Sequence, residues 1–113
     1  MKTVMLFIIL TSITIINQVN SQVKIINNTN FSLKNINIYS TSFKSLNPKD
    51  STDFKKFNYQ EYSNNSFIQL KSRDTLFFIS ISPPEQNKKI TLSIDSLNFK
   101  NRIIYYSEKL TEI

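Results

Sequence analysis

Two lysines and two tyrosines near the middle of the chain are the side chains best suited to bind a ligand. Lys55 and Lys56 are adjacent, and Tyr59 and Tyr62 follow within the next six residues. Ammonium groups attract anions, and a tyrosine ring offers an apolar face for stacking beside a hydroxyl for hydrogen bonding. Lys55, Lys56, Tyr59 and Tyr62 are therefore the candidate ligand-binding residues, suited to an anionic sugar or to nucleic acid bases and phosphates.

A second interpretation of this segment needs no ligand. If the segment is a strand, Phe54 and Phe57 supply apolar side chains to the core, while Lys55 and Lys56 remain in water. Tyrosines with buried rings and hydrogen-bonded hydroxyls would produce the same pattern as a sugar-stacking surface. The sequence favours this structural interpretation.

Residue types that are missing from the chain exclude most catalytic chemistry. The sequence contains no His, Cys, Gly or Trp. Without His and Cys, no serine–histidine or cysteine–histidine nucleophile can be assembled, and zinc, copper and iron–sulfur centres lose their usual ligands. Without Gly, neither a P-loop nor a dinucleotide-binding fingerprint can be present. We therefore expect no cofactor.

The acidic residues give no better catalytic or metal site. Eight of them are scattered along the chain, whereas carboxylate catalysis needs two acids that converge on one bond. Asp50 and Asp53 could bind calcium from one loop, but no further oxygen donors accompany them, and Asp50 better suits the capping of a turn. The sequence thus predicts a protein that is not an enzyme and holds no metal.

The segments that must position these side chains have the pattern of β-strands. Apolar and polar residues alternate with a period of two, and β-branched and aromatic residues are abundant. No window has the apolar spacing of a long helix. About seven strands are predicted, at 23–26, 31–40, 52–58, 67–71, 76–82, 89–97 and 102–107. This pattern is typical of a single antiparallel β-sandwich.

Three local features refine this prediction. The apolar phase shifts between Leu33 and Ile36, which predicts a β-bulge near Asn35. Residues 76–79 are apolar throughout, which predicts a central strand that is covered on both faces. Because the chain has no glycine, we expect asparagine to occupy the left-handed turn positions.

The first 21 residues have the features of an export signal. Lys2 gives a positive start, residues 4–16 form an apolar run interrupted only by Thr and Ser, and Val19 and Ser21 stand where signal peptidase inspects the chain. A run of this length is shorter than the roughly 17–25 residues that span a bilayer. The sequence therefore favours a cleaved signal peptide at 1–21 over a membrane anchor.

Cleavage after Ser21 leaves residues 22–113 as one small domain, secreted or periplasmic, without a stable membrane span. Exported domains of this size usually contain disulfides, so this cysteine-free domain must rely on packing and on hydrogen bonds between strands. Loss of Lys2 lowers the formal net charge from +6 to +5. The charge favours anionic partners, although lysines spread along the sequence also serve solubility.

The order of the motifs is similar to that of a known group of proteins. A signal peptide, then Ile25–Phe31, then an Asn47-Pro48 turn leading to Ser51–Phe54, resembles small exported immunoglobulin-like or transthyretin-like β-sandwich proteins of Gram-negative bacteria, whose function is unknown. In that group a glycine usually follows the proline of the turn, and a lipid-bearing cysteine is common. Here Lys49 replaces the glycine and the cysteine is absent. The resemblance implies the fold and export, and it supplies no catalytic residue.

We therefore expect an exported, non-enzymatic immunoglobulin-like β-sandwich that binds another protein of the cell envelope through its sheet edges or loops. The alternative is a binder of anionic glycan or lipopolysaccharide through a basic face that carries tyrosines. Nucleic acid is not expected as a partner, because an exported protein rarely meets it. Salt should weaken glycan binding steeply and should weaken a packed protein interface little.

Overall fold

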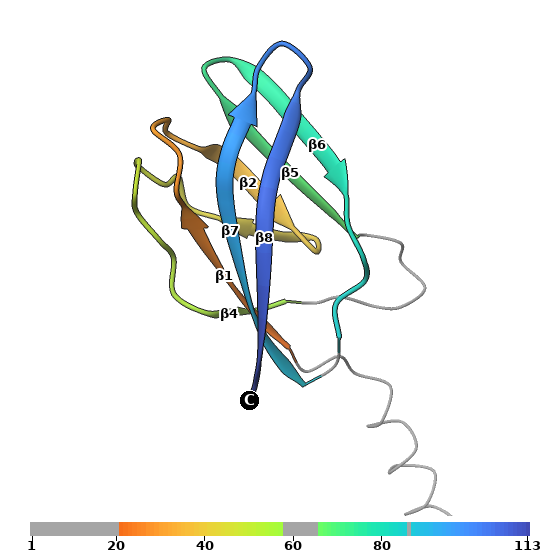
Figure 1. Cartoon of the computed structure of the whole chain (residues 1–113). Helices are drawn as coiled ribbons and strands as arrows, with labels where there is room; N and C mark the ends of the chain where they lie inside the picture. The colour runs from red at the N-terminus through yellow and green to blue at the C-terminus, as the bar shows by residue number, and fades with distance from the viewer. Residues whose placement is uncertain (1–20, 58–65, 86) are drawn as a thin grey trace, which may run out of the picture.

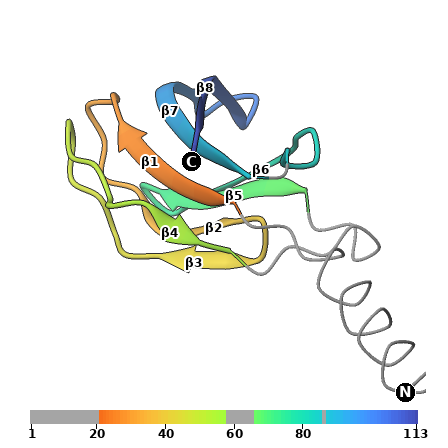
Figure 2. The ribbon, with the colours of Figure 1, turned by 90° about the horizontal axis from the view of Figure 1, so that it is seen from below.

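Eight strands arranged in two sheets make up the part of the chain that the computed structural model describes, residues 21–57, 66–85 and 87–113. No helix occurs in these residues. The first sheet has the strand order β4-β1-β7-β8 and the second has the order β3-β2-β5-β6. The sheets pack against each other as a sandwich (Figures 1 and 2). The strands are β1 (Gln22–Asn27), β2 (Lys34–Ile38), β3 (Thr41–Phe43), β4 (Lys55–Lys56), β5 (Phe67–Ser72), β6 (Thr75–Ser80), β7 (Lys88–Asn98) and β8 (Ile103–Glu112).

The core lies between the two sheets and follows from the period-two pattern. Alternate residues of β1, β5 and β7 are buried, and both sheets contribute. Each large aliphatic side chain that is withdrawn from water stabilises the fold by about 1.5–3 kcal/mol, and the chain has no cysteine to add a disulfide. The fully buried side chains include Val23, Ile25, Ile90, Leu92 and Ile94 from the first sheet, and Ile36, Ile38, Ile68, Leu70 and Phe77 from the second.

The prediction of a purely antiparallel sandwich is wrong in one strand pair. β1 runs parallel to β7, in a register from Gln22 opposite Lys89 to Asn27 opposite Ile94. All other strand pairs among the described residues are antiparallel. Alternation tells which face of a strand is buried but not the direction of its neighbour, because parallel and antiparallel strands share the period of two.

Of residues 31–40, predicted as one strand, only Lys34–Ile38 form β2, and a tight turn then leads into β3 at Thr41. Tyr39 and Ser40 make the turn with positive φ of 51° and 59°, although the sequence has no Gly or Pro there. The bulge predicted near Asn35 is confirmed, since the pairing of β2 with β5 shifts register between Lys34 and Asn37 and Asn35 has a φ of 50°.

Two other strand lengths differ from the prediction. Of the strand predicted at 52–58, residue 58 lies outside the described residues, and among the others only β4 pairs in a ladder. Ser51, just before this segment, forms an isolated bridge with Ile26. The last strand, predicted to end at residue 107, continues as β8 to Glu112. Its final residues are mostly polar, so apolar alternation does not reveal them. Backbone hydrogen bonds to β7 are sufficient to extend the strand.

Residues 76–79 lie in β6, which is an edge strand and not the predicted central one. Phe77 is fully buried, whereas Leu76 is 50% exposed and Phe78 is 56% exposed. A run that is apolar on both faces therefore does not mean burial on both faces here, because only one face of β6 meets the core.

The prediction that asparagine takes the left-handed positions is only partly correct. Asparagine takes two of these positions within the described residues, and other residue types take the rest. At Lys49, which follows the proline of the Asn47-Pro48 turn, φ is 65°, so a lysine takes a left-handed position there without a glycine. The described residues with positive φ are Asn35, Tyr39, Ser40, Lys49, Arg73, Asp74, Asn87 and Arg102.

One buried asparagine joins the end of β1 to two loops. Asn27 is fully buried, and its side-chain amide donates to the carbonyl oxygens of Phe31 at 2.8 Å and Asn47 at 3.1 Å. Its Oδ1 accepts hydrogen bonds from the backbone N–H and the hydroxyl of Thr29, at 3.0 and 2.6 Å. The side chain thereby satisfies backbone groups that would otherwise be buried without partners.

Replacing Asn27 by Ala should lower the free energy of unfolding by about 2–4 kcal/mol, because several buried groups lose their partners together. Urea unfolding of the purified protein measures the loss. Asn28→Ala is the matched control, because the Asn28 amide bonds Ser93 in an exposed position, and its loss should be below about 1 kcal/mol. Equal losses in the two variants would contradict the role of Asn27.

Candidate functional site

The structure separates the two predicted lysines and leaves the two predicted tyrosines untested. Tyr59 and Tyr62 lie outside the described residues. Lys55 donates from Nζ to the carbonyl oxygen of Ser42 at 2.8 Å and lies 5.5 Å from the ring centroid of Phe43. Lys55 thus links β4 to β3 across the two sheets. Lys56, the next residue, must point the opposite way from the strand.

The two phenylalanines beside these lysines have different environments. Phe57 is buried and its ring stacks on Tyr39 at a centroid distance of 5.0 Å, as the structural interpretation predicts. Phe54 instead is 37% exposed, and the ammonium groups of Lys24 and Lys89 lie 5.8 and 5.1 Å from its ring centroid. Phe54 therefore belongs to a surface of the first sheet and not to the core.

An open hollow of about 490 Å³ lies beside β4 and is lined by residues 43–46 and 50–55. Asp50 and Asp53, the two candidate calcium ligands, both line it. The Asp50 backbone N–H donates to the carbonyl oxygen of Asn47 at 3.1 Å, and the Asp50 carboxylate accepts from the Ser51 N–H at 2.9 Å. Asp50 therefore closes a turn. Within the described residues no three side chains of the metal-binding types come together.

Four lysines from different strands gather on the outer face of the first sheet. Lys56 and Lys89 are each paired in register with Gln22, and Lys24 and Lys109 are each paired with Thr91. Residues paired directly across strands share a face. We call these four lysines, Lys24, Lys56, Lys89 and Lys109, the basic face. Sequence reasoning missed it because the register that unites distant residues is absent from local patterns.

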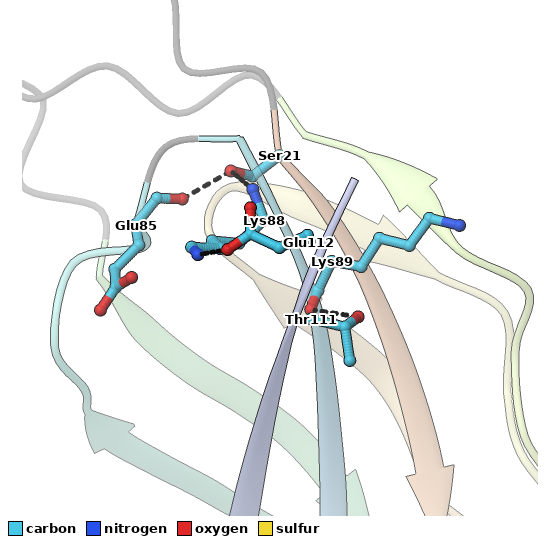
Figure 3. A network of polar contacts seen from close by, with 6 residues as sticks. All are labelled: Ser21, Glu85, Lys88, Lys89, Thr111 and Glu112. Atoms are coloured by element: carbon cyan, nitrogen blue, oxygen red, sulfur yellow. Dashed lines mark hydrogen bonds and ion pairs between the residues drawn. The ribbon is translucent and has the colours of Figure 1, made fainter.

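At the start of β7, Lys89 of the basic face and the ion pair of its neighbour Lys88 lie on different sides of the strand (Figure 3). Lys88 bonds Glu112, and this hydrogen bond raises the pKa of Lys88 against the opposing effect of desolvation. The side chain of Lys89, the next residue, runs away from that pair (Figure 3). Lys88 is thus neutralised by its partner, whereas Lys89 faces solvent beside Phe54.

Ser21 fixes the beginning of β1 to the same end of β7. Its side chain is buried, donates from Oγ to the Glu85 carbonyl oxygen at 2.5 Å, and accepts from the Lys88 N–H at 3.3 Å (Figure 3). Ser21 is the last residue of the predicted signal peptide. The packed part of the described chain therefore includes one residue before Gln22, where we placed the mature start.

The second candidate surface is the free edge of β6. Arg73 and Asp74, both with positive φ, join β5 to β6 in a two-residue turn, which makes Ser72 and Thr75 a hydrogen-bonded pair. At the other end of the β5–β6 ladder, the Ile81 N–H donates to the Ser66 carbonyl oxygen at 3.1 Å, so Ser66 and Ile81 are also a hydrogen-bonded pair. This agrees with the alternation that begins at Ser72 and Thr75.

The phase of the ladder fixes which backbone groups of β6 are free. Hydrogen-bonded pairs alternate along an antiparallel ladder. The N–H and C=O groups of Leu76, Phe78 and Ser80 therefore point away from β5. No strand among the described residues pairs with this side of β6. These residues are also the ones whose side chains face solvent.

β6 differs from the other three edge strands because neither charged side chains nor a short length protects it from pairing with another chain. β4 consists of two lysines, β3 has three residues, and the exposed end of β8 carries charged side chains. β6 has six residues without a charge or a proline. Charges, prolines and short length normally prevent a sheet edge from pairing with another chain. β6 therefore lacks the features that normally keep a sheet edge from pairing with a further strand, and β8 of the other sheet lies close to it without forming a ladder.

Comparison of the chain with protein-family models, with curated proteins and with solved structures finds no match. Within the described residues, no helix has the length and apolar character needed to cross a bilayer.

A proline at Ser80 should leave the fold intact, since the Ser80 N–H makes no bond to β5. We expect Ser80→Pro to cost less than about 1 kcal/mol of unfolding free energy, and Ile79→Pro, which removes a ladder hydrogen bond, to cost about 3 kcal/mol or more. Urea unfolding of both variants measures the difference. Comparable destabilisation by the two prolines would show that the assigned free edge is wrong.

Proposed function

We propose that this chain is an exported, non-enzymatic module that binds a protein partner of the cell envelope by strand addition at β6. The observation that carries the proposal is the coincidence on β6 of free backbone groups with exposed apolar side chains. An added strand would bond to the backbone of Leu76, Phe78 and Ser80. Main-chain hydrogen bonds would supply affinity, and contacts with alternate side chains would supply specificity.

The chemistry of the edge describes the partner segment. Leu76 and Phe78 project on the outer face, and Phe67 of β5 stacks on Phe78 at a centroid distance of 5.0 Å. Together they form an apolar strip beside the free backbone groups. The segment that fits is extended, has apolar side chains at alternate positions on the same side as Leu76 and Phe78, and needs no charged residue opposite β6.

Export and the immunoglobulin-like type of the sandwich belong to the same proposal. Export is supported by the apolar run and cleavage motif in the first 21 residues. The absence of His and Cys from the sequence supports a binding role over nucleophilic catalysis. A secreted or periplasmic location would place β6 among other envelope proteins.

A photoreactive residue placed at Phe78 should form an adduct with the partner in native cells. Addition of Ser80→Pro should abolish the adduct, because the proline removes an edge N–H and places a ring in the path of the incoming strand. Ser80→Ala should preserve it. Mass spectrometry of the adduct identifies the segment that is attached.

The same probe at Tyr105, which is 50% exposed on β8, is the control position. Strand addition at β6 is rejected if Tyr105 captures the same partner equally well, or if the Phe78 adduct survives Ser80→Pro.

Export is tested by the intact mass and N-terminus of the protein in each fraction of its native cells. We expect a soluble species that begins at Gln22, because signal peptidase favours small residues at the two inspected positions. A full-length species in the inner membrane would instead identify the apolar run as an anchor.

A further inference from the structure

The lysines of the basic face form two rows across the first sheet. One row runs Lys56, Gln22, Lys89, Thr111, and the next runs Lys24, Thr91, Lys109. Neighbouring strands are about 4.8 Å apart, and residues two apart on a strand are separated by about 7 Å. Neighbouring lysines are therefore attached to the sheet roughly 8–10 Å apart. A single small anion cannot reach all four, whereas an extended chain with repeated anionic groups can.

Within the part of the chain that the structure describes, no carboxylate forms an ion pair with these four lysines. Within the described residues, the ion pair Lys88–Glu112 is the only one, and it involves none of the four lysines. Asp95 lies further along β7 and is engaged by Ser93 and Asn28 at 2.9 and 3.4 Å. Burial opposes ionisation of Asp95, but hydrogen bonds from Ser93, Ser107 and Asn28 outweigh it and lower the pKa. The basic face is thus a surface of one sign.

Phe54 holds two of the positive charges together. The ammonium groups of Lys24 and Lys89 both lie within 6 Å of its ring centroid, a distance at which the ring attracts cations. This attraction offsets part of the repulsion between the two like charges. Lys24 and Lys89 are therefore already held close together in the unbound protein, which lowers the side-chain entropy that is lost when an anion binds.

The residues between the lysines favour a sugar polymer over nucleic acid or a membrane. Gln22, Thr91 and Thr111 place an amide and two hydroxyls between the cations, and these groups can hydrogen-bond to sugar hydroxyls. Sequence-tolerant nucleic acid binders need open aromatic platforms, but Phe54 already carries two ammonium groups. Membrane-surface binding needs apolar side chains that insert, whereas Gln22, Thr91 and Thr111 are polar and the Phe54 ring is occupied by the ammonium groups of two lysines.

We infer that the basic face binds a polysaccharide with repeated anionic groups, at a site separate from β6 and independent of the proposed protein partner. Lys24, Lys56, Lys89 and Lys109 would contact successive carboxylate, sulfate or phosphate groups, and Gln22, Thr91 and Thr111 would contact the sugars. The site differs from the four residues singled out in the sequence and shares only Lys56 with them.

The test measures binding of the full chain to polygalacturonate and to dextran sulfate, with neutral dextran as the blank, in about 50 mM salt where screening is weak. We expect the variant Lys24→Gln, Lys89→Gln, Lys109→Gln to lose at least about tenfold in affinity. The control variant Lys34→Gln, Lys71→Gln, Lys100→Gln removes the same charge elsewhere, and it should lose less than about threefold. Both variants must unfold at the same urea concentration as the parent.

Several results would overturn the inference. They are failure of the parent chain to bind either polyanion, equal losses in the two triple variants, or tighter binding to single-stranded DNA or to phosphatidylglycerol vesicles than to both polysaccharides. Ser80→Pro should bind the polysaccharides like the parent. A failure of the polysaccharide inference can therefore be distinguished from a failure of the proposed strand addition at β6.

Discussion

The hydrogen bonds of the buried Asn27 amide are the constraint on which the rest of the structure depends. The chain has neither glycine to make sharp turns freely nor cysteine to cross-link its loops, and one side chain at the end of β1 performs part of both tasks. By bonding the backbone at Thr29, Phe31 and Asn47, it fixes where β1 ends and where the loop before β4 begins. The position of β1 in turn sets its register with β4 and β7. The surfaces that are built on those strands therefore follow from it.

The two candidate surfaces have different physical origins. The edge of β6 is a candidate binding surface because, within the described residues, it has no paired strand, no charge and no proline. The basic face is a candidate binding surface because the strand register places lysines from four strands on one side of a sheet. The first suits a partner that completes a sheet and depends little on salt. The second suits a polyanion whose attraction is electrostatic.

Much of the fold could be predicted from local sequence, and the exceptions share a cause. Alternation located β1, β5 and β7 and their buried residues, and the phase shift near Asn35 located the bulge. The turn at Tyr39 and Ser40 was missed because neither residue type favours positive φ. The exposed Phe78 was assigned to the interior because apolar residues on both faces of a strand do not tell which face meets another sheet. Of the two predicted lysines, Lys56 lies on the basic face and Lys55 does not, and nothing in the local sequence relates Lys56 to Lys89.

The sequence by itself determined the all-β fold class, the buried faces of most strands and the residue types that the chain lacks, because these depend on residue type and on the short period of a strand. Only the tertiary structure decided that β1 runs parallel to β7, that β6 lies at an edge, and that Lys24, Lys56, Lys89 and Lys109 share a face. The physical reason is that strand pairing joins residues far apart in the chain. The direction, order and register of strand pairing are set by the packing of the whole sandwich, so they cannot be read from any single segment of the sequence.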